Sequence, residues 1–215
     1  MEAELRGYAD VVAHDLREPI TGIAHLVTLL ERGAGAPADP EALALLRAST
    51  ERARELIDGV LVYARAGELR REPVALGQLM DEVATDLRPS LEAAGATLEV
   101  AELPAVEGDA RQLRRLLQNL VGNAVKFHGE APPRVEVSAP QGPEDWVVTV
   151  RDNGLGVAHD DVERIFGMFA RARGEAEGTG IGLAVCRRVV EAHGGRIWVE
   201  QPEDGGSAFR FTLPR

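Results

Sequence analysis

Residues 14–19 could carry out nucleophilic chemistry, and they read HDLREP. They lie in a stretch whose apolar residues have helical spacing, and His14 is two residues from both Val12 and Leu16 of that apolar seam. Two residues correspond to about 200° around a helix, so His14 points away from the seam and does not serve core packing. Asp15 beside it can keep one ring nitrogen protonated and leave the other as a nucleophile. His14 is therefore a candidate catalytic residue, although most helical histidines carry no chemistry.

A helix predicted over 109–127 has one apolar side and one polar side. Its apolar face consists of Leu113, Leu116, Leu117, Leu120, Val121 and Ala124. The other side carries Gln112, Asn119, Asn123 and Lys126. Asparagine is a poor helix former, so two of them a turn apart require a reason. Amide oxygens could hold Mg²⁺ and its waters, and Lys126, the only lysine of the chain, could contact phosphate. A solvated polar face would explain the same stripe.

The segment 152–156 follows a predicted strand and reads DNGLG. Asp, Asn and Gly are turn residues, so a hairpin turn explains this segment without any ligand. Alternatively, a buried Asp152 could accept a hydrogen bond from an exocyclic amine such as that of adenine. Gly154 and Gly156 would then let the backbone approach the ring. These residues alone leave both interpretations open.

A second glycine-rich segment, 178–183, reads GTGIGL and precedes a predicted helix. Glycine amides at a helix N-terminus form a phosphate site. No strand precedes the segment directly and no Gly-Lys-Ser/Thr follows it, so neither a dinucleotide-binding fingerprint nor a P-loop fits. Before it, Phe166, Phe169 and Arg171 lie in a segment whose composition suits a mobile lid with an arginine able to reach phosphate. Together with His14, these groups describe phosphoryl transfer from ATP to a histidine of the same protein.

The elements that must position these groups fall into two parts. Residues 1–32 carry an apolar seam with alternating steps of four and three, and a second seam follows the turn-rich segment 33–40. Two such helices form a hairpin that cannot cover its own seam, so we expect dimerisation into a four-helix bundle. Pro19 should kink the first helix. The polar connector 65–73 predicts a boundary between domains 1–68 and 69–215.

The second part has a mixed pattern that favours an α+β class. Helices are predicted at 76–94, 109–127, 158–170 and 181–193, and strands at 97–101, 134–139, 146–151, 196–200 and 207–213. Helices and antiparallel hairpins in this order predict an α/β sandwich with the helices on one face of the sheet.

The bulk composition excludes several classes of protein. The formal net charge of −11 over 215 residues argues against nucleic acid or an anionic membrane as the main partner. The single cysteine, Cys186, allows no disulfide framework and suits a reducing compartment. The sequence has no signal peptide and no apolar run long enough to span a bilayer, so we expect a cytoplasmic location, as part of a larger soluble or membrane-attached protein, and no membrane contact by this chain.

Taken in this order, the motifs resemble those of the catalytic core of two-component sensor histidine kinases. Residues 14–19 resemble the H box, 119–126 the N box, 152–156 the G1 box, 166–169 the F box and 178–182 the G2 box. The run 8–19 is similar to the subgroup found in bacterial phytochromes. The resemblance covers essentially the whole chain.

This resemblance implies a dimerising histidine-phosphotransfer hairpin followed by an ATP-binding domain of the Bergerat (GHKL) type. It further implies that His14 is the phosphoacceptor, activated by Asp15, and that Asn123 is the Mg²⁺ ligand, with Asn119 and Lys126 near the phosphates. Asp152 would read adenine, and Arg171 would act from the lid. The remaining pocket residues would be Gly154, Gly156, Phe166, Phe169, Gly178, Thr179, Gly180, Ile181, Gly182 and Leu183.

The implied cofactors are ATP and Mg²⁺, and the implied partners are a second copy of the chain and the receiver domain of a response regulator. The first residues already have helical spacing, so we expect an upstream sensor domain outside this chain. Kinases of this family that dephosphorylate their partner often carry Thr or Asn four residues after the histidine, where this chain has Glu18. A carboxylate repels a phosphoaspartate, so we expect slow phosphatase activity. The alternatives are another ATPase of the same fold or a catalytically inactive dimeric scaffold.

Overall fold

The computed structural model describes residues 20–24, 26–28, 40, 42–50, 53, 57, 69–142, 145–170 and 180–214. The chain divides into an N-terminal unit and a larger unit that contains the sheet, and each is described by itself. The expected kink at Pro19 lies outside the described residues.

The described part of the N-terminal unit is helical at 20–24, 26–28 and 42–50, inside the two helices expected from the apolar seams. Thr28 Oγ1 donates to the carbonyl of Ala24 (2.9 Å), and Thr50 Oγ1 donates to that of Leu46 (2.7 Å). Large apolar side chains here remain between 41% and 56% exposed: Ile20, Val27, Leu43, Leu45 and Ile57. The unit therefore presents apolar surface to solvent.

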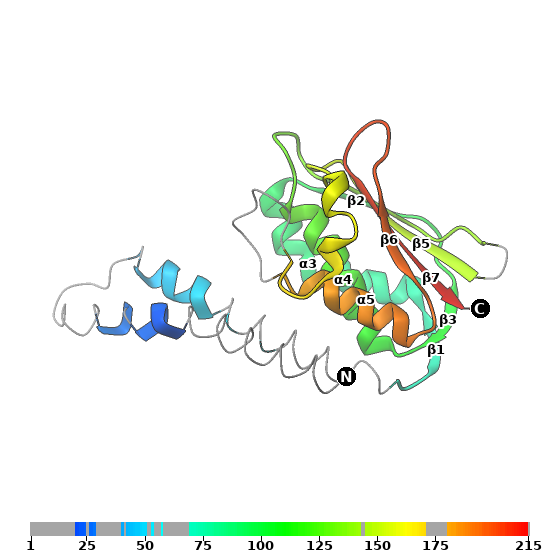
Figure 1. Ribbon diagram of the computed structural model, residues 1–215, viewed down its shortest axis with the longest axis horizontal. Coiled ribbons are helices and arrows are strands. Elements are labelled where there is room, and N and C mark those ends of the chain that lie inside the picture. The colour runs from blue at the N-terminus through cyan, green and yellow to red at the C-terminus, as the bar shows by residue number, and fades with distance from the viewer. Residues whose placement is uncertain are drawn as a thin grey trace. The chain divides into compact units, whose positions relative to one another are not determined.

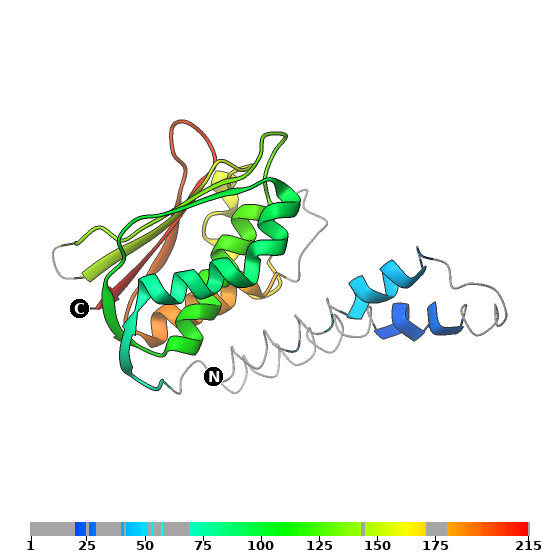
Figure 2. The same cartoon turned by 180° about the vertical axis from the view of Figure 1, so that it is seen from behind.

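The larger unit consists of a five-stranded sheet with three helices on one face (Figures 1 and 2). The strand order is β2-β4-β5-β7-β6. The strands are β2 (Thr97–Val100), β4 (Arg134–Ser138), β5 (Asp145–Asp152), β6 (Ile197–Glu200) and β7 (Ser207–Pro214). The helices are α3 (Leu76–Ala94), α4 (Ala110–Lys126) and α5 (Gly182–Ala192). The predicted α+β sandwich with helices on one face is confirmed.

The core lies between this helical layer and the sheet. The central pair β5 and β7 is antiparallel, with Val148 opposite Phe211 and Val150 opposite Phe209. All four side chains are buried, because alternate residues of a strand point to the same face. Helix α4 contributes the apolar face predicted from its spacing, and all six of those residues are buried.

Helix α4 has well-defined ends. Asp109 is its N-cap, and its carboxylate accepts a hydrogen bond from the amide of Gln112 (3.0 Å). Such a cap satisfies one of the amides that have no partner in the first turn. At the other end, the amide of Phe127 donates to the carbonyl of Asn123 (2.9 Å).

Three sequence predictions were wrong in detail. The segment 158–170 forms no α-helix but two short turns, η1 (His159–Asp161) and η2 (Arg164–Phe166), and the chain after them leaves helical geometry at Gly167 (ψ 152°). Strand β2 pairs with β4 in parallel, whereas only antiparallel hairpins were expected in the sheet. A small sheet of β1 (Glu72–Ala75) and β3 (Ala105–Gly108) was missed, because Pro73 argues against a strand and β3 is short.

Replacing Leu120 with alanine should lower the free energy of unfolding by about 2–5 kcal/mol, because the side chain is fully buried and leaves a cavity. Urea unfolding followed by circular dichroism measures this change. The matched control is Leu155→Ala, whose side chain is 66% exposed and should cost no more than about 0.5 kcal/mol. Equal losses in the two variants would contradict the described core.

Candidate functional site

The polar side of α4 faces the beginning of α5. Asn119 Nδ2 donates to the carbonyl of Gly182 (3.4 Å), which is the first residue of α5. Asn119 and Asn123 are both half-buried, and Lys126 at the end of the helix is exposed. The polar side predicted for this helix is therefore present, and it borders the N-terminus of α5, which the second glycine segment forms.

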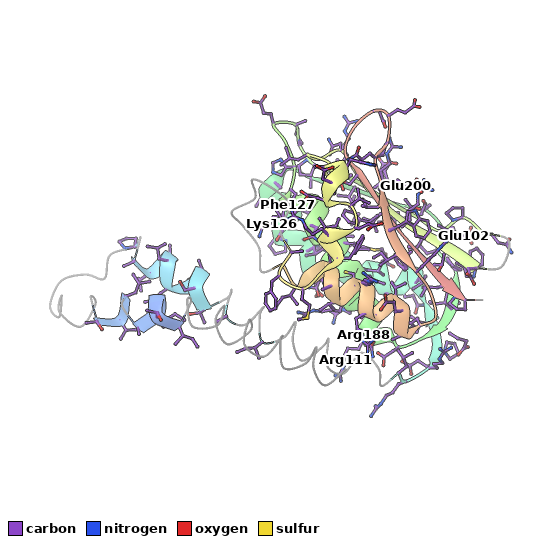
Figure 3. All side chains as sticks on the ribbon, viewed as in Figure 1. Glu102, Arg111, Lys126, Phe127, Arg188 and Glu200 are labelled. Carbon is purple, nitrogen blue, oxygen red and sulfur yellow. The ribbon has the colours of Figure 1, made fainter. Side chains whose placement is uncertain are left out.

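Phe127 extends this site beyond the last residue of α4. The Lys126 ammonium lies 5.5 Å from the centre of the Phe127 ring, and Figure 3 labels both side chains. The carbonyl of Phe127 accepts a hydrogen bond from the amide of Leu155 (3.1 Å), so it holds the first glycine segment against α4. Sequence reasoning missed Phe127, although its position directly after Lys126 was the available signal.

Asp152 ends β5 as a nearly buried carboxylate that is 7% exposed. Its Oδ1 accepts hydrogen bonds from the amides of Gly154 (2.8 Å) and Ser207 (3.1 Å). Burial raises the pKa of this carboxyl above its usual range, and the two amide hydrogen bonds oppose that rise. In the part of the chain that the structure describes, both bonds end on one oxygen, so Oδ2 is the oxygen that a donor on a ligand would meet.

The first glycine segment is held in place by close backbone approaches. A Cβ on Gly154 would overlap the carbonyl of Phe127, and Gly156 has a left-handed φ of +75°. Gly206 supports the same loop, since a Cβ on Gly206 would overlap the backbone of Asp152. These contacts explain glycine at 154 and 156 by close packing of the backbone and a left-handed φ, whereas the expected approach to an adenine ring stays a prediction. Gly206 lies too far away in sequence to have been linked to Asp152.

The second glycine segment leads into α5. Gly180 has a φ of +67°, and a Cβ there would lie 2.7 Å from the carbonyl carbon of Phe169. Ile181 is buried and is the N-cap of α5, while Gly182 and Leu183 begin the helix and are half-buried. This end of α5 presents backbone amides and the positive end of the helix dipole, an arrangement suited to an anion.

The two phenylalanines of the predicted lid differ in environment. Phe166 is buried and packs edge-on against Phe209 of the sheet, with ring centres 6.3 Å apart. Phe169 is half-buried and has a φ of +62°, which is unusual for a bulky residue. Phe166 is therefore a core residue, and Phe169 is the one that lies beside Gly180.

Several predicted site residues lie outside the described residues: His14, Asp15, Glu18, Arg171, Gly178 and Thr179. The structure brings the others together from α4, from the end of β5 and from the start of α5.

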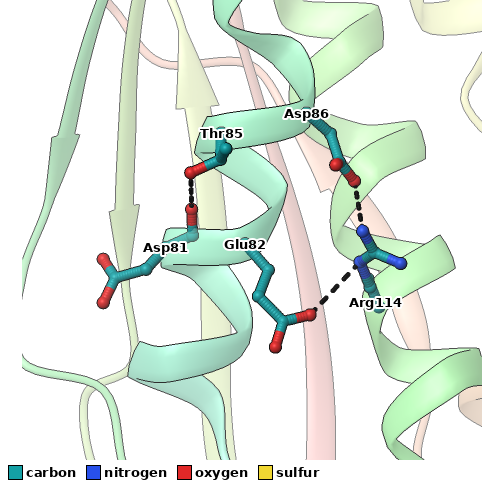
Figure 4. A pocket seen from close by; sticks show the side chains of 5 residues that line it. All are labelled: Asp81, Glu82, Thr85, Asp86 and Arg114. Atoms are coloured by element: carbon teal, nitrogen blue, oxygen red, sulfur yellow. Dashed lines mark hydrogen bonds and ion pairs between the residues drawn. The ribbon is translucent and has the colours of Figure 1, made fainter.

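A separate groove between α3 and α4 is lined by polar residues (Figure 4). Arg114 contacts Glu82 (3.4 Å) and Asp86 (2.5 Å), and Thr85 Oγ1 donates to the carbonyl of Asp81 (2.9 Å). Arg114 of α4 thus forms ion pairs with two carboxylates of α3, whereas the Thr85 hydrogen bond lies within α3. The groove is therefore a link between helices rather than a second ligand site.

Family models match most of the chain. One described as "Histidine kinase-, DNA gyrase B-, and HSP90-like ATPase" matches residues 108–215, and one described as "His Kinase A (phospho-acceptor) domain" matches residues 4–69. Among curated relatives, cyanobacterial phytochrome A of Nostoc sp. is 36% identical over 99% of this chain. This chain spans only 29% of that relative's length.

Solved structures agree with these matches. The histidine kinase ThkA, in a complex with the response regulator protein TrrA, superposes with a TM-score of 0.78 and 25% identity over 99% of this chain and 62% of that one. Full-length ShkA in complex with AMPPNP gives a TM-score of 0.70 and 31% identity over 97% of this chain and 45% of that one. The chain belongs to the sensor histidine kinases that join a HisKA domain to a HATPase domain. In the described residues, no helix is long and apolar enough to cross a membrane.

Replacing Asp152 with asparagine should raise the free energy of unfolding at pH 7. The folded-state pKa is above the ordinary value of 3.8, so the contribution of this group to stability is full below pH 3.8 and is lost as the pH rises through the raised pKa. Asparagine carries no charge to bury, and its Oδ1 can still accept both amide hydrogen bonds. Urea unfolding between pH 4 and pH 8 measures the difference in unfolding free energy between Asp152→Asn and the wild type, and this difference should increase with pH.

The control for that comparison is Asp160→Asn, which neutralises an exposed carboxylate and should change stability by no more than about 0.5 kcal/mol. An Asp152→Asn variant that is less stable than the wild type at pH 7 would show that the charged form is favoured in the fold.

Proposed function

We propose that this chain binds Mg-ATP between α4 and α5 and transfers the γ-phosphoryl group to His14. The observation that carries the proposal is the nearly buried Asp152 carboxylate, held by two backbone amides and close to the end of α4. A buried acceptor of this kind is costly unless a donor meets it, and the exocyclic amine of adenine is such a donor.

The other described site residues have consistent roles. The amides of Gly180 and Gly182 at the start of α5 receive the phosphates, and Lys126 adds a cation from α4. Asn119 fixes the start of α5 through its hydrogen bond to Gly182. Gly178, Thr179 and Arg171 complete the phosphate side in this proposal.

Asn123 fits the role of a Mg²⁺ ligand. Its amide oxygen is a hard donor on the half-buried side of α4. When bound, Mg²⁺ balances charge on the phosphoryl oxygens.

In the reaction, a ring nitrogen of His14 attacks the γ-phosphorus in line with the bridging oxygen. The N–P bond forms as the bond from the γ-phosphorus to that oxygen breaks, and ADP leaves with the electron pair. Asp15 holds the other ring nitrogen protonated, so the attacking nitrogen keeps its lone pair. Phosphohistidine then supplies the group to a receiver-domain aspartate.

Two partners follow from this proposal. A second copy of the chain covers the apolar residues that the N-terminal unit exposes, among them Ile20, Leu45 and Ile57. A response regulator accepts the phosphoryl group, and the ThkA structure that resembles this chain was determined with such a protein. A different ATPase of the same fold does not account for the match of residues 4–69 to a phospho-acceptor domain. The presence of every expected pocket residue in the sequence favours an active kinase over an inactive scaffold.

Replacing His14 with alanine should abolish phosphorylation of the chain and leave ATP binding and dimerisation unchanged. Incubation with γ-labelled ATP and Mg²⁺, followed by acid and alkali treatment, measures the product. The wild type should carry acid-labile, alkali-stable label. Label that persists on the His14→Ala variant would overturn the assignment.

Replacing Asn123 with alanine should weaken Mg-dependent ATP binding by at least about tenfold, because a metal ligand is lost. Isothermal titration calorimetry with and without Mg²⁺ measures the change. Gln118→Ala is the matched control, since it removes an amide from another side of α4. Unchanged affinity in Asn123→Ala would exclude Asn123 from the site.

A further inference from the structure

Helices α4 and α5 are antiparallel and are joined at three levels. Asn119 contacts Gly182 at the site end, and Cys186 Sγ lies 3.9 Å from the carbonyl of Leu116 in the middle. At the far end, the amide of Asp109 donates to Nε2 of His193 (3.0 Å), just beyond the last residue of α5. Burial raises the pKa of the Cys186 thiol to about 12, so the middle contact is weak and uncharged.

The far contact requires one particular form of the His193 ring. The ring is 1% exposed, and its Nδ1 lies 2.8 Å from the carbonyl of Val189. A carbonyl can only accept, so Nδ1 carries the proton and donates it. Nε2 is then an unprotonated acceptor, as the Asp109 amide requires. A doubly protonated ring would direct an N–H at that amide.

Gly108 leaves the space that the His193 ring occupies beside the start of α4. A Cβ on Gly108 would lie 3.0 Å from both Cδ2 and Nε2 of His193 and 2.8 Å from a methyl carbon of Leu113. The absence of a side chain at 108 therefore allows the ring to reach the backbone at the start of α4.

Asp109 also ties the segment that enters the domain to the same point. Its Oδ1 caps the amide of Gln112 (3.0 Å), and its Oδ2 accepts from the amide of Arg70 (3.1 Å). One residue thus connects the start of α4, the end of α5 and the chain just before β1.

We propose that the Asp109–His193 hydrogen bond is a positioning contact that sets how α4 lies along α5, and thereby places Asn123 for ATP. Asn123 is about 21 Å along the helix from Asp109, so a shift or rotation at the capped end is carried to the site by the rigid helix. Arg70 couples the entering segment to this contact. The inference rests on the proposed ATP site.

Acid should break the contact. Burial lowers the pKa of the His193 ring; the carbonyl of Val189 and the Asp109 carboxylate oppose this shift, and Arg71 reinforces it. The folded-state pKa is therefore below the unfolded value near 6.5, so the contribution of the neutral ring is full above pH 6.5 and declines as the pH falls toward the folded-state pKa. The charged groups that face the ring are Asp109, from the start of α4, and Arg71, from the segment before β1; Gly108, Leu113 and Val189 add no titrating group.

The test measures Mg-ATP affinity by calorimetry from pH 5.5 to 8. The variants are His193→Gln, whose amide oxygen can still accept from the Asp109 amide but does not titrate, and His193→Phe, which fills the space without an acceptor. His159→Gln, at an exposed histidine in η1, controls for loss of a titrating ring elsewhere.

The wild type and His159→Gln should lose affinity together as the pH falls. His193→Gln should keep wild-type affinity at pH 8 and show a flatter profile, and His193→Phe should bind about tenfold more weakly at every pH, because it leaves a buried amide without a partner. A pH profile shared by the wild type and His193→Gln, or wild-type affinity in His193→Phe, would overturn the inference.

Amide hydrogen exchange separates the possible failures. Wild-type protein that binds no Mg-ATP at any pH would refute the proposed function, and the inference about α4 would then be decided by amide hydrogen exchange. Exchange along 110–126 should be faster in His193→Phe than in His193→Gln if the contact holds the helix, and equal if it does not. Should His193→Phe fail to fold, the comparison of the wild type with His193→Gln still decides the outcome, because a shared pH profile contradicts the inference.

Discussion

Helix α4 must bury one side completely while its other side stays available to a ligand, and the placement of that helix controls the site. Leu113, Leu116 and Leu120 are almost entirely removed from solvent, so the helix cannot rotate without exposing them. With the apolar side fixed, Asn119 is directed to the start of α5, and Asn123 lies about one turn further along the same side of α4. The same burial that stabilises the domain therefore orients the polar side chains.

Backbone proximity is the second constraint, and it explains the glycines. Gly154 passes the carbonyl of Phe127, Gly180 passes Phe169, and Gly206 passes Asp152, each at a distance that no side chain would permit. These approaches bring the end of β5, the end of α4 and the start of α5 together. A carboxylate, a helix N-terminus and an amide stripe thus converge although they come from distant parts of the sequence.

Periodicity predicted the helices 76–94, 109–127 and 181–193 and five strands within a few residues, because each buries a regular face. Periodicity wrongly predicted a helix at 158–170, where the chain forms turns near Gly167. It also missed β1, because Pro73 is unusual in a strand and β1 depends on pairing with β3. Asp152 and the glycine segments were found as motifs. Phe127, Gly206 and the Asp109–His193 contact were not, since their significance lies in contacts between residues far apart in sequence.

The central claim is that α4, α5 and Asp152 enclose one nucleotide site, and a structure of this chain with Mg²⁺ and a non-hydrolysable ATP analogue would test it most directly. We predict the adenine amine within hydrogen-bond distance of Asp152, the phosphates over the amides at 180–182, and the metal on the amide oxygen of Asn123. A nucleotide bound elsewhere, or adenine with no contact to Asp152, would contradict the account.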